Sequence, residues 1–355
     1  MSAHHPYADL PDSRFWRAGV VEADRLAWHD LYCPKFPVTA QTEIATAGSC
    51  FAQHIGRALA GAGVVPLNGE PAPASMHPQT AERFQYGLYS ARYGNIYTAR
   101  QFRELLDDAA TGHVDDRLIW RARRRFFDAL RPSVEPDGWI SQAEVMAMRR
   151  DHLMRVQAVA ESADVFVFTL GLTEAWIDTA TGRTVPTAPG VIAGRYKPAQ
   201  VRFHNYSYDE IMEDLAGIRD ALQVARAGSK LLLTVSPVPL TATASGAHVL
   251  AATQLSKAIL RAAAGDFADA HDDVDYFPSY EIVTTHASGE MAFAQNRRSV
   301  RPEMVARVMD VFLRAHGLEP SEQGPKPSFD ASEPQDADEE DALVCEEALL
   351  DAMRE

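Results

Sequence analysis

The segment TEIATAGSCFAQHIGRAL, residues 42–59, decides the fold. Its apolar stretch at 44–47 predicts a β-strand, which ends abruptly at Gly48-Ser49-Cys50. From Phe51 onward, apolar residues recur at every fourth position, and this period predicts a helix with one apolar face. A glycine and two potential nucleophiles therefore occupy the junction between a strand and a helix.

The same order of strand and helix recurs along the chain. Apolar runs at 163–171, 229–237 and 273–277 predict strands, the first two buried on both faces. Helical patterns follow or precede them; they span about 99–109, 141–162, 206–228, 249–271 and 301–317. This alternation is typical of an α/β protein with a parallel sheet and helices on both faces.

Polar and glycine residues follow the predicted strands. The first ends in GSC, the second in GLTE at 171–174, and the third in SP at 236–237. Ligands of open parallel sheets bind beyond the carboxyl ends of the strands. We therefore expect a site at this edge.

Three regions are expected from composition. Residues 1–40, rich in aromatics and prolines, form an N-terminal arm lying on the body; residues 41–318 form the α/β domain; residues 319–355 form a disordered acidic tail with a possible short helix at its end. The net charge is −15, of which −10 lies beyond residue 320, so the body gives no case for nucleic-acid binding. The tail is either solubilising or a contact for a protein partner.

Other classes of function lack their sequence signals. Three distant cysteines make no disulfide framework, and neither a signal peptide nor an apolar run long enough for a membrane span is present, so we expect a cytoplasmic protein without membrane contact. The sequence holds no P-loop, dinucleotide fingerprint or zinc spacing, and we expect no cofactor and no metal.

The GSC junction has two interpretations. The first turn of a helix leaves N–H groups unpaired at the positive end of the helix dipole, which stabilises a thiolate or an oxyanion. Alternatively, Ser49 only caps the helix and Cys50 only fills a small buried space.

Five ordered blocks resemble the GSCFA-domain family: GSCFA (48–52), TLGLTEAW (169–176), TVSPV (234–238), QLSKAIL (254–260) and DYFPSYEI (275–282). That family is similar to the SGNH/GDSL-like hydrolases. The resemblance implies a flavodoxin-like, doubly wound parallel sheet and the chemistry of esterases and acyltransferases.

The resemblance also implies roles for individual residues. Cys50 aligns with the nucleophile, and a shift of one position gives Ser49 instead. Gly94, with Asn95 beside it, is the candidate oxyanion glycine, and Gly171, Thr173 and Glu174 match the block that ordinarily holds glycine, asparagine and aspartate.

One block departs from the hydrolase pattern. Where that group has an aspartate and a histidine before the last helix, this chain has Asn296 and Ser299 and no histidine. His54 and His204, and less so His286, are the alternative bases. A cysteine at a helix N-terminus depends less on a base than serine does.

Arginines suggest an anionic substrate. The cluster includes Arg121, Arg125 and Arg131, and Arg298 lies near the departed block, although a solvated basic face explains the cluster equally well. We expect an acyl-ester hydrolase or acyltransferase acting on a small-molecule or glycan ester. The alternative is a non-catalytic protein that binds an anionic metabolite or sugar on the same scaffold.

Overall fold

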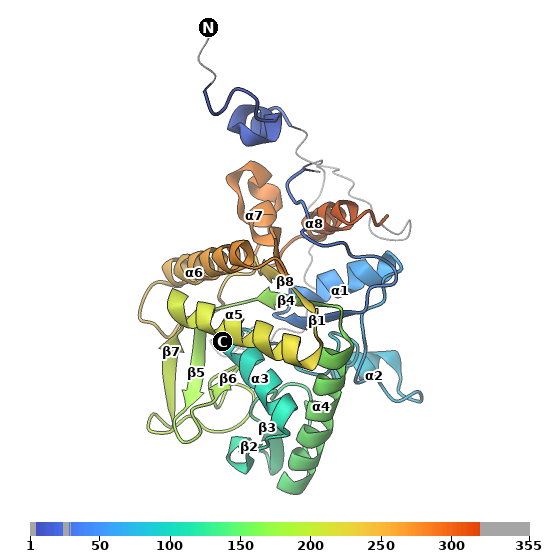
Figure 1. Ribbon diagram of the computed structural model, residues 1–355. Helices are drawn as coiled ribbons and strands as arrows, with labels where there is room; N and C mark the ends of the chain where they lie inside the picture. The colour runs from blue at the N-terminus through green and yellow to red at the C-terminus, as the bar shows by residue number, and fades with distance from the viewer. Residues whose placement is uncertain (1–4, 24–27, 29, 320–355) are drawn as a thin grey trace.

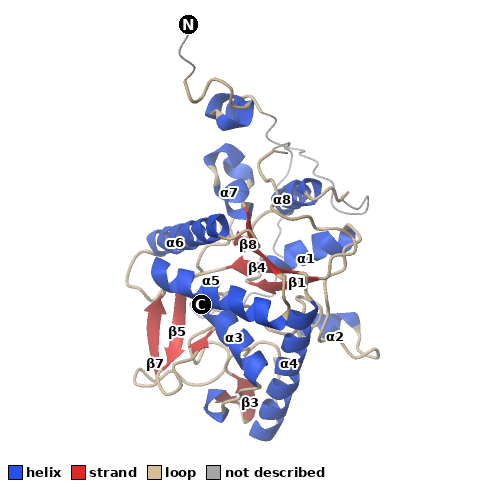
Figure 2. Ribbon diagram, in the orientation of Figure 1, coloured by secondary structure: helices blue, strands red, loops and turns tan. Residues whose placement is uncertain are grey.

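A four-stranded parallel sheet forms the centre of the protein in a computed structural model, which describes residues 5–23, 28 and 30–319. The strand order is β1-β4-β8-β9, and all neighbouring pairs are parallel. The bounds are Ile44–Gly48 for β1, Val165–Leu170 for β4, Lys230–Val235 for β8 and Val274–Phe277 for β9. The expected α/β class and parallel sheet are confirmed (Figures 1 and 2).

Helices cover both faces of this sheet (Figure 1). One face carries α1 (Ala52–Gly61), α7 (Ser279–Thr284) and α8 (Pro302–Ala315); the other carries α3 (Ala99–Thr111), α4 (Gln142–Ser162), α5 (Tyr208–Ala225) and α6 (Val249–Ala270). Side chains of β4 alternate between the two cores: Val165 and Val167 join the first, Phe166 and Phe168 the second. Burial on both sides explains why this strand is a continuous apolar run.

The N-terminal region packs on the α1 and α8 face over part of its length. Trp28, Tyr32, Phe36 and Val38 are buried in that core. The Tyr32 hydroxyl donates to Asp275 Oδ2 at 2.8 Å, which ties this segment to β9. Two short helical turns, η1 (Asp12–Arg14) and η2 (Arg17–Val21), contribute no buried residue. The acidic segment expected to be disordered lies, beyond residue 319, outside the described residues.

The sequence interpretation missed two small antiparallel sheets. One has the order β6-β5-β7, with β5 at Glu174–Asp178, β6 at Thr184–Val185 and β7 at Val201–Asn205. The other is a hairpin of β2 (Ile119–Ala122) and β3 (Arg125–Asp128), which follows the turn η3 (Asp116–Leu118). A short helix, α2 (Pro78–Arg83), and the turn η4 (His286–Met291) complete the elements.

These elements were missed because their sequence signals are weak. The strands have five residues or fewer. The turn between β2 and β3 consists of Arg123 and Arg124, both at positive φ (50° and 63°), where Asn-Gly is the usual signature. In the sequence, an arginine pair at that position indicates a charged cluster and gives no sign of a hairpin turn.

Candidate active site

Gly48 makes the junction between β1 and α1 possible. Its φ is +139°, and a Cβ there would lie 2.5 Å from the carbonyl oxygen of Thr169 on β4. Only glycine fits so close an approach with that backbone conformation. Ser49 N then donates to Thr169 O at 3.2 Å, and Ala52 N donates back to Ser49 O at 2.9 Å as the chain turns into α1.

Ser49 and Cys50 are both buried, with 3% and 4% of their surface exposed. Ser49 does not cap α1, because the residue at the N-cap is Phe51 and no side chain accepts a capping bond there. Among the described residues, the Ser49 hydroxyl has no hydrogen-bond partner. A buried hydroxyl without a partner costs about 1–3 kcal/mol, so its presence needs a reason.

The loop before α3 meets this junction. Ile96 N donates to Gly48 O at 2.9 Å. The Tyr89 hydroxyl lies 2.6 Å from Asn95 Oδ1 and 3.2 Å from Ser49 O, so one phenol links the loop to the junction. Asn95 and Ile96 of this loop are thus tied to the GSC motif, whereas Gly94, at a left-handed φ of +71°, lies against Val134, Arg131 and Ser133.

The chain leaving β4 forms the second wall. A Cβ on Gly171 would lie 3.0 Å from Ser49 Cβ, so the two residues are in contact. The N–H groups of Gly171 and Leu172 both donate to Tyr97 O, at 3.0 and 2.8 Å. The Gly171 N–H is thus already engaged, and this residue contributes space rather than a donor.

Thr173 is fully buried and engaged at both of its polar groups. Its N–H donates to Ser256 Oγ at 3.0 Å, and its hydroxyl donates to Asn205 Oδ1 at 2.6 Å. Asn205 stands on β7 directly opposite Glu174 of β5. An amide side chain from another strand therefore lies against Thr173.

Glu174 is 9% exposed at the start of β5. The Thr243 hydroxyl, from the segment between β8 and α6, donates to Glu174 Oε1 at 2.6 Å. Burial raises the pKa of Glu174, and the bond from Thr243 partly offsets this rise. Glu174 thereby holds the β8–α6 segment against the end of the sheet.

A buried lysine on α6 also reaches this place. Lys257 is 1% exposed, and its Nζ donates to Gly171 O at 2.6 Å. The neighbouring Ser256 is the acceptor for Thr173 N–H. Both residues belong to the QLSKAIL block, and neither was predicted as a site residue. The sequence did contain a signal for Lys257, because a lysine one turn from Thr253 and one turn from Leu260 lies on the buried face of the helix, where lysine is rare.

The three candidate histidines have different surroundings. His204 Nε2 lies 2.7 Å from Glu210 Oε1, within the capping box of α5. His286 stacks on Trp16 with ring centroids 5.3 Å apart. His54 is buried on α1 with its ring edge against Phe51. His204 and His286 therefore each have a local structural contact.

The segment at 296–299, where the sequence differs from the hydrolase pattern, is an exposed turn before α8. Asn296 Oδ1 accepts from the N–H groups of Arg298 and Ser299, both at 2.9 Å, and Asn296 Nδ2 donates to Ser299 Oγ. Asn296 thus shapes its own turn, and Arg298 is half-buried beside it.

The arginine cluster does not form one surface. Arg121 lies over the Phe126 ring within the hairpin, and Arg125 is exposed. Arg131 is 1% exposed and pairs with Asp128 at 3.0 Å. These residues are close in sequence, which is why a shared anion-binding patch is expected from the sequence. In the structure, Arg121 and Arg125 lie on opposite faces of the hairpin, and Arg131 is buried.

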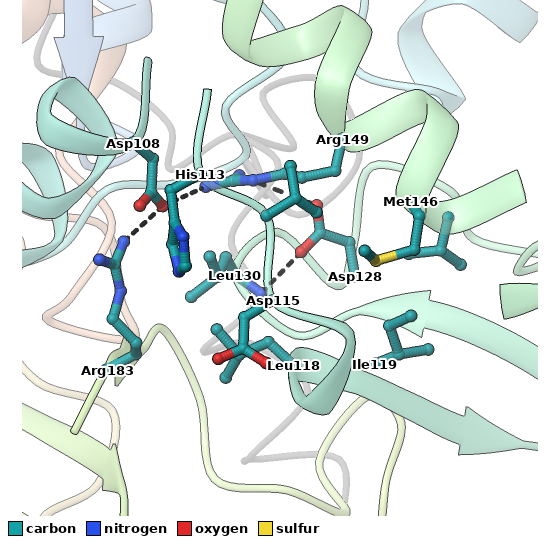
Figure 3. A pocket seen from close by; sticks show the side chains of 12 residues that line it. Asp108, His113, Asp115, Leu118, Ile119, Asp128, Leu130, Met146, Arg149 and Arg183 are labelled. Carbon is teal, nitrogen blue, oxygen red and sulfur yellow. Dashed lines mark hydrogen bonds and ion pairs between the residues drawn. The ribbon is translucent and has the colours of Figure 1, made fainter. Parts of the chain in front are cut away.

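Asp128 belongs to a buried ion network that lines a small pocket (Figure 3). Asp108 pairs with both Arg149 and Arg183, while Asp128 accepts from Arg131. Burial alone would raise the pKa of Asp128, but Arg149 and Arg131 hold it below its usual range. The pocket interior is about 20 Å³, enough for a water molecule and too small for a substrate.

Comparison with known proteins identifies the family. The sequence model of the GSCFA family matches residues 43–312, which include the whole parallel sheet and the helices on both of its faces. The chain belongs to the GSCFA family. A search of curated proteins finds no match for it. The GSCFA motif itself runs from Gly48, the last residue of β1, to Ala52, the first residue of α1.

Two further observations apply to the described part of the chain. Its helices include none with the length and apolarity needed to cross a membrane. It contains no group of three or more His, Cys, Asp or Glu side chains arranged to hold a metal ion.

Proposed function

We propose that this GSCFA protein is an acyl-ester hydrolase or acyltransferase of SGNH/GDSL-like type, working through an acyl-enzyme on the GSC motif. The observation that carries the proposal is the Ser49 hydroxyl, which is buried without a described partner where β1 meets α1. Cys50, the next residue, is the competing nucleophile. The parallel sheet with helices on both faces supports a doubly wound, flavodoxin-like relationship.

The chemistry follows from the junction. The nucleophile attacks the ester carbonyl, and the positive end of the α1 dipole stabilises the oxyanion. The N–H groups of Ala52, Gln53 and His54 themselves donate to the carbonyl oxygens of the three preceding residues. Asn95 is tied to the junction through Tyr89, whose hydroxyl lies 2.6 Å from Asn95 Oδ1 and 3.2 Å from Ser49 O. Water or an acceptor alcohol then releases the acyl group. The substrate class is a small-molecule or glycan ester.

Substrate entry requires movement of the segment between β8 and α6. Leu240 of this segment packs in a small apolar cluster with Tyr97 and Leu172, next to Gly171. The bond from Thr243 to Glu174 fastens the same segment. Opening it exposes the strand ends and the nucleophile together.

The test is covalent labelling with fluorophosphonate and iodoacetamide, followed by intact-mass measurement and peptide mapping. We expect rapid, stoichiometric modification at one residue of the GSC motif, and its loss in either Ser49→Ala or Cys50→Ala. Cys33, which is exposed, serves as the internal control for ordinary thiol reactivity.

A second function is favoured by the missing histidine. The turn at 296–299 hydrogen-bonds to itself, and both candidate nucleophiles are buried. A binding protein for an anionic metabolite or sugar would show no preferential labelling at Ser49 or Cys50. That result would replace the enzyme proposal with this one.

A further inference from the structure

The GSC site still needs a base, and α6 brings a buried amine to it. Lys257 Nζ is held at 2.6 Å by the carbonyl oxygen of Gly171. Gly171 in turn lies against Ser49, because a Cβ on it would come within 3.0 Å of Ser49 Cβ. One residue therefore contacts both the amine and the hydroxyl-bearing side chain.

The burial of Lys257 is unusual for a structural role. Its exposed fraction is 1%, in a stripe of α6 that is otherwise built from small and apolar residues such as Ala264 and Leu260. Burying an amine is costly, so a lysine at this position needs a reason beyond packing. Catalytic lysines are found in such environments.

We propose that Lys257 is the general base and acid for Ser49, in the place of the absent histidine. The inference rests on the proposed acyl-enzyme function. The step requires Nζ to move from Gly171 O to Ser49 Oγ; catalytic bonds are often formed only when substrate is bound. Lysine has the long, flexible stem that such a movement needs.

The step balances without any further reactant. The Ser49 Oγ–H proton passes to neutral Nζ as Oγ bonds to the ester carbonyl carbon. The bond from that carbon to the leaving oxygen breaks, and the leaving alcohol takes the proton from Nζ. Water, or an acceptor alcohol, then gives its proton to Nζ while it attacks the acyl-enzyme, and Ser49 Oγ recovers the proton on release.

The experiment measures the rate of fluorophosphonate labelling at Ser49 in the full chain between pH 6 and 10. In the wild type we expect a rate that rises with pH to a plateau as Lys257 loses its proton. Lys257→Met should lower the plateau rate by about 100-fold or more, the usual contribution of a general base. Lys257→Arg keeps the charge but cannot accept a proton, and it should be equally slow.

Two controls separate catalysis from folding. Lys230→Met makes the same change at the amino end of β8, where Nζ lies over the Phe36 ring, and it should label at the wild-type rate. Thermal unfolding of each variant reports its stability. A folded Lys257→Arg variant that labels Ser49 at the wild-type rate would overturn the inference.

The remaining outcomes distinguish the role of Lys257 from the acyl-enzyme proposal. Labelling at Cys50 that is unaffected by Lys257→Met would overturn the role of Lys257 and leave the acyl-enzyme proposal standing. Absence of labelling at both residues in the wild type would overturn both.

Discussion

At the scale of single residues, the backbone geometry of Gly48 positions the side chains of the candidate site. Gly48 allows the chain to pass against Thr169 and turn at once into α1. Ser49 and Cys50 follow in positions that are fixed by this approach rather than by their own hydrogen bonds to the helix. The site is therefore sensitive to a methyl group added at the junction.

Gly48→Ala should destabilise the protein by about 3–5 kcal/mol, because the new Cβ meets the Thr169 carbonyl at 2.5 Å and the positive φ strains any other residue. Urea unfolding measures the change. Gly56→Ala is the matched control within α1. Its Cβ would have only Thr46 Oγ1 nearby, at 3.8 Å, so it should stabilise the helix by about 0.5–1 kcal/mol. Equal effects of the two substitutions would refute this account of Gly48.

A second residue-scale prediction concerns His152, which is fully buried with Nδ1 2.7 Å from Glu70 Oε2. Burial lowers the pKa of His152 to about 4. Above about pH 6.5 the imidazole is neutral in both states. As the pH is lowered from 6.5 to 4, the unfolded chain takes up a proton at this residue and the folded protein does not. The free energy of unfolding therefore decreases over this range, by roughly 3 kcal/mol for this residue.

His152→Gln keeps a donor for Glu70 and removes the titration. Its free energy of unfolding should lie closest to that of the wild type at pH 4 and furthest below it at pH 7. His316, whose pKa burial also lowers to about 4, retains its own contribution in both proteins and cancels in the comparison. A difference between the two proteins that does not change with pH would show that His152 is not held neutral.

At the scale of elements, short irregular strands surround a regular sheet. The hairpin of β2 and β3 turns at Arg123 and Arg124, which both occupy the left-handed region at a cost of about 1–2 kcal/mol each. Figure 1 shows this hairpin beyond α3 and α4, away from the central sheet. The strain is therefore confined to a part of the fold that can be changed separately from the site.

Arg124→Asn should raise the free energy of unfolding by about 0.5–1 kcal/mol, since asparagine tolerates the left-handed region better than arginine does. Arg125→Asn removes the same charge one position later, in β3, where asparagine is disfavoured, and it should not stabilise the protein. Thermal unfolding compares the two. A stabilisation of equal size in both would mean that relief of charge repulsion, and not the backbone, is responsible.

The sequence predicted the elements that are long and buried. The runs ending at Gly171 and at Pro237 were recognised as strands because both faces of the sheet are covered, and their order placed the GSC and GLTE motifs at one edge. Asn205 and Lys257 were not predicted as site residues, because their relation to Thr173 and Gly171 depends on how β7 and α6 pack, which no local pattern encodes. The same limit applies to the arginine cluster, whose neighbours in sequence diverge in space.

At the scale of the whole molecule, the N-terminal region completes one of the two cores. The buried residues of this region lie against α1 and α8; they are Trp28, Tyr32, Phe36 and Val38. Helix α1 is the one that begins at the end of the GSCFA motif. The exposed turns before them, η1 and η2, bury nothing. The family match begins at residue 43, so this contribution to the core precedes the matched region.

Deletion of residues 1–22 should leave the free energy of unfolding within about 1 kcal/mol of the wild type, because η1 and η2 bury no side chain and the stacking of Trp16 on His286 is a single ring contact. Deletion of residues 1–40 removes four buried side chains, each worth about 1.5–3 kcal/mol, and should remove most of a stability of about 5–15 kcal/mol. Urea unfolding of the two truncated chains provides the comparison. Tyr32→Phe measures the share of the hydrogen bond in the effect of the longer deletion. It removes only the bond to Asp275 and should cost about 1–3 kcal/mol. If the longer deletion unfolded at the same urea concentration as the shorter one, the α1 and α8 core would have to be complete without the N-terminal region.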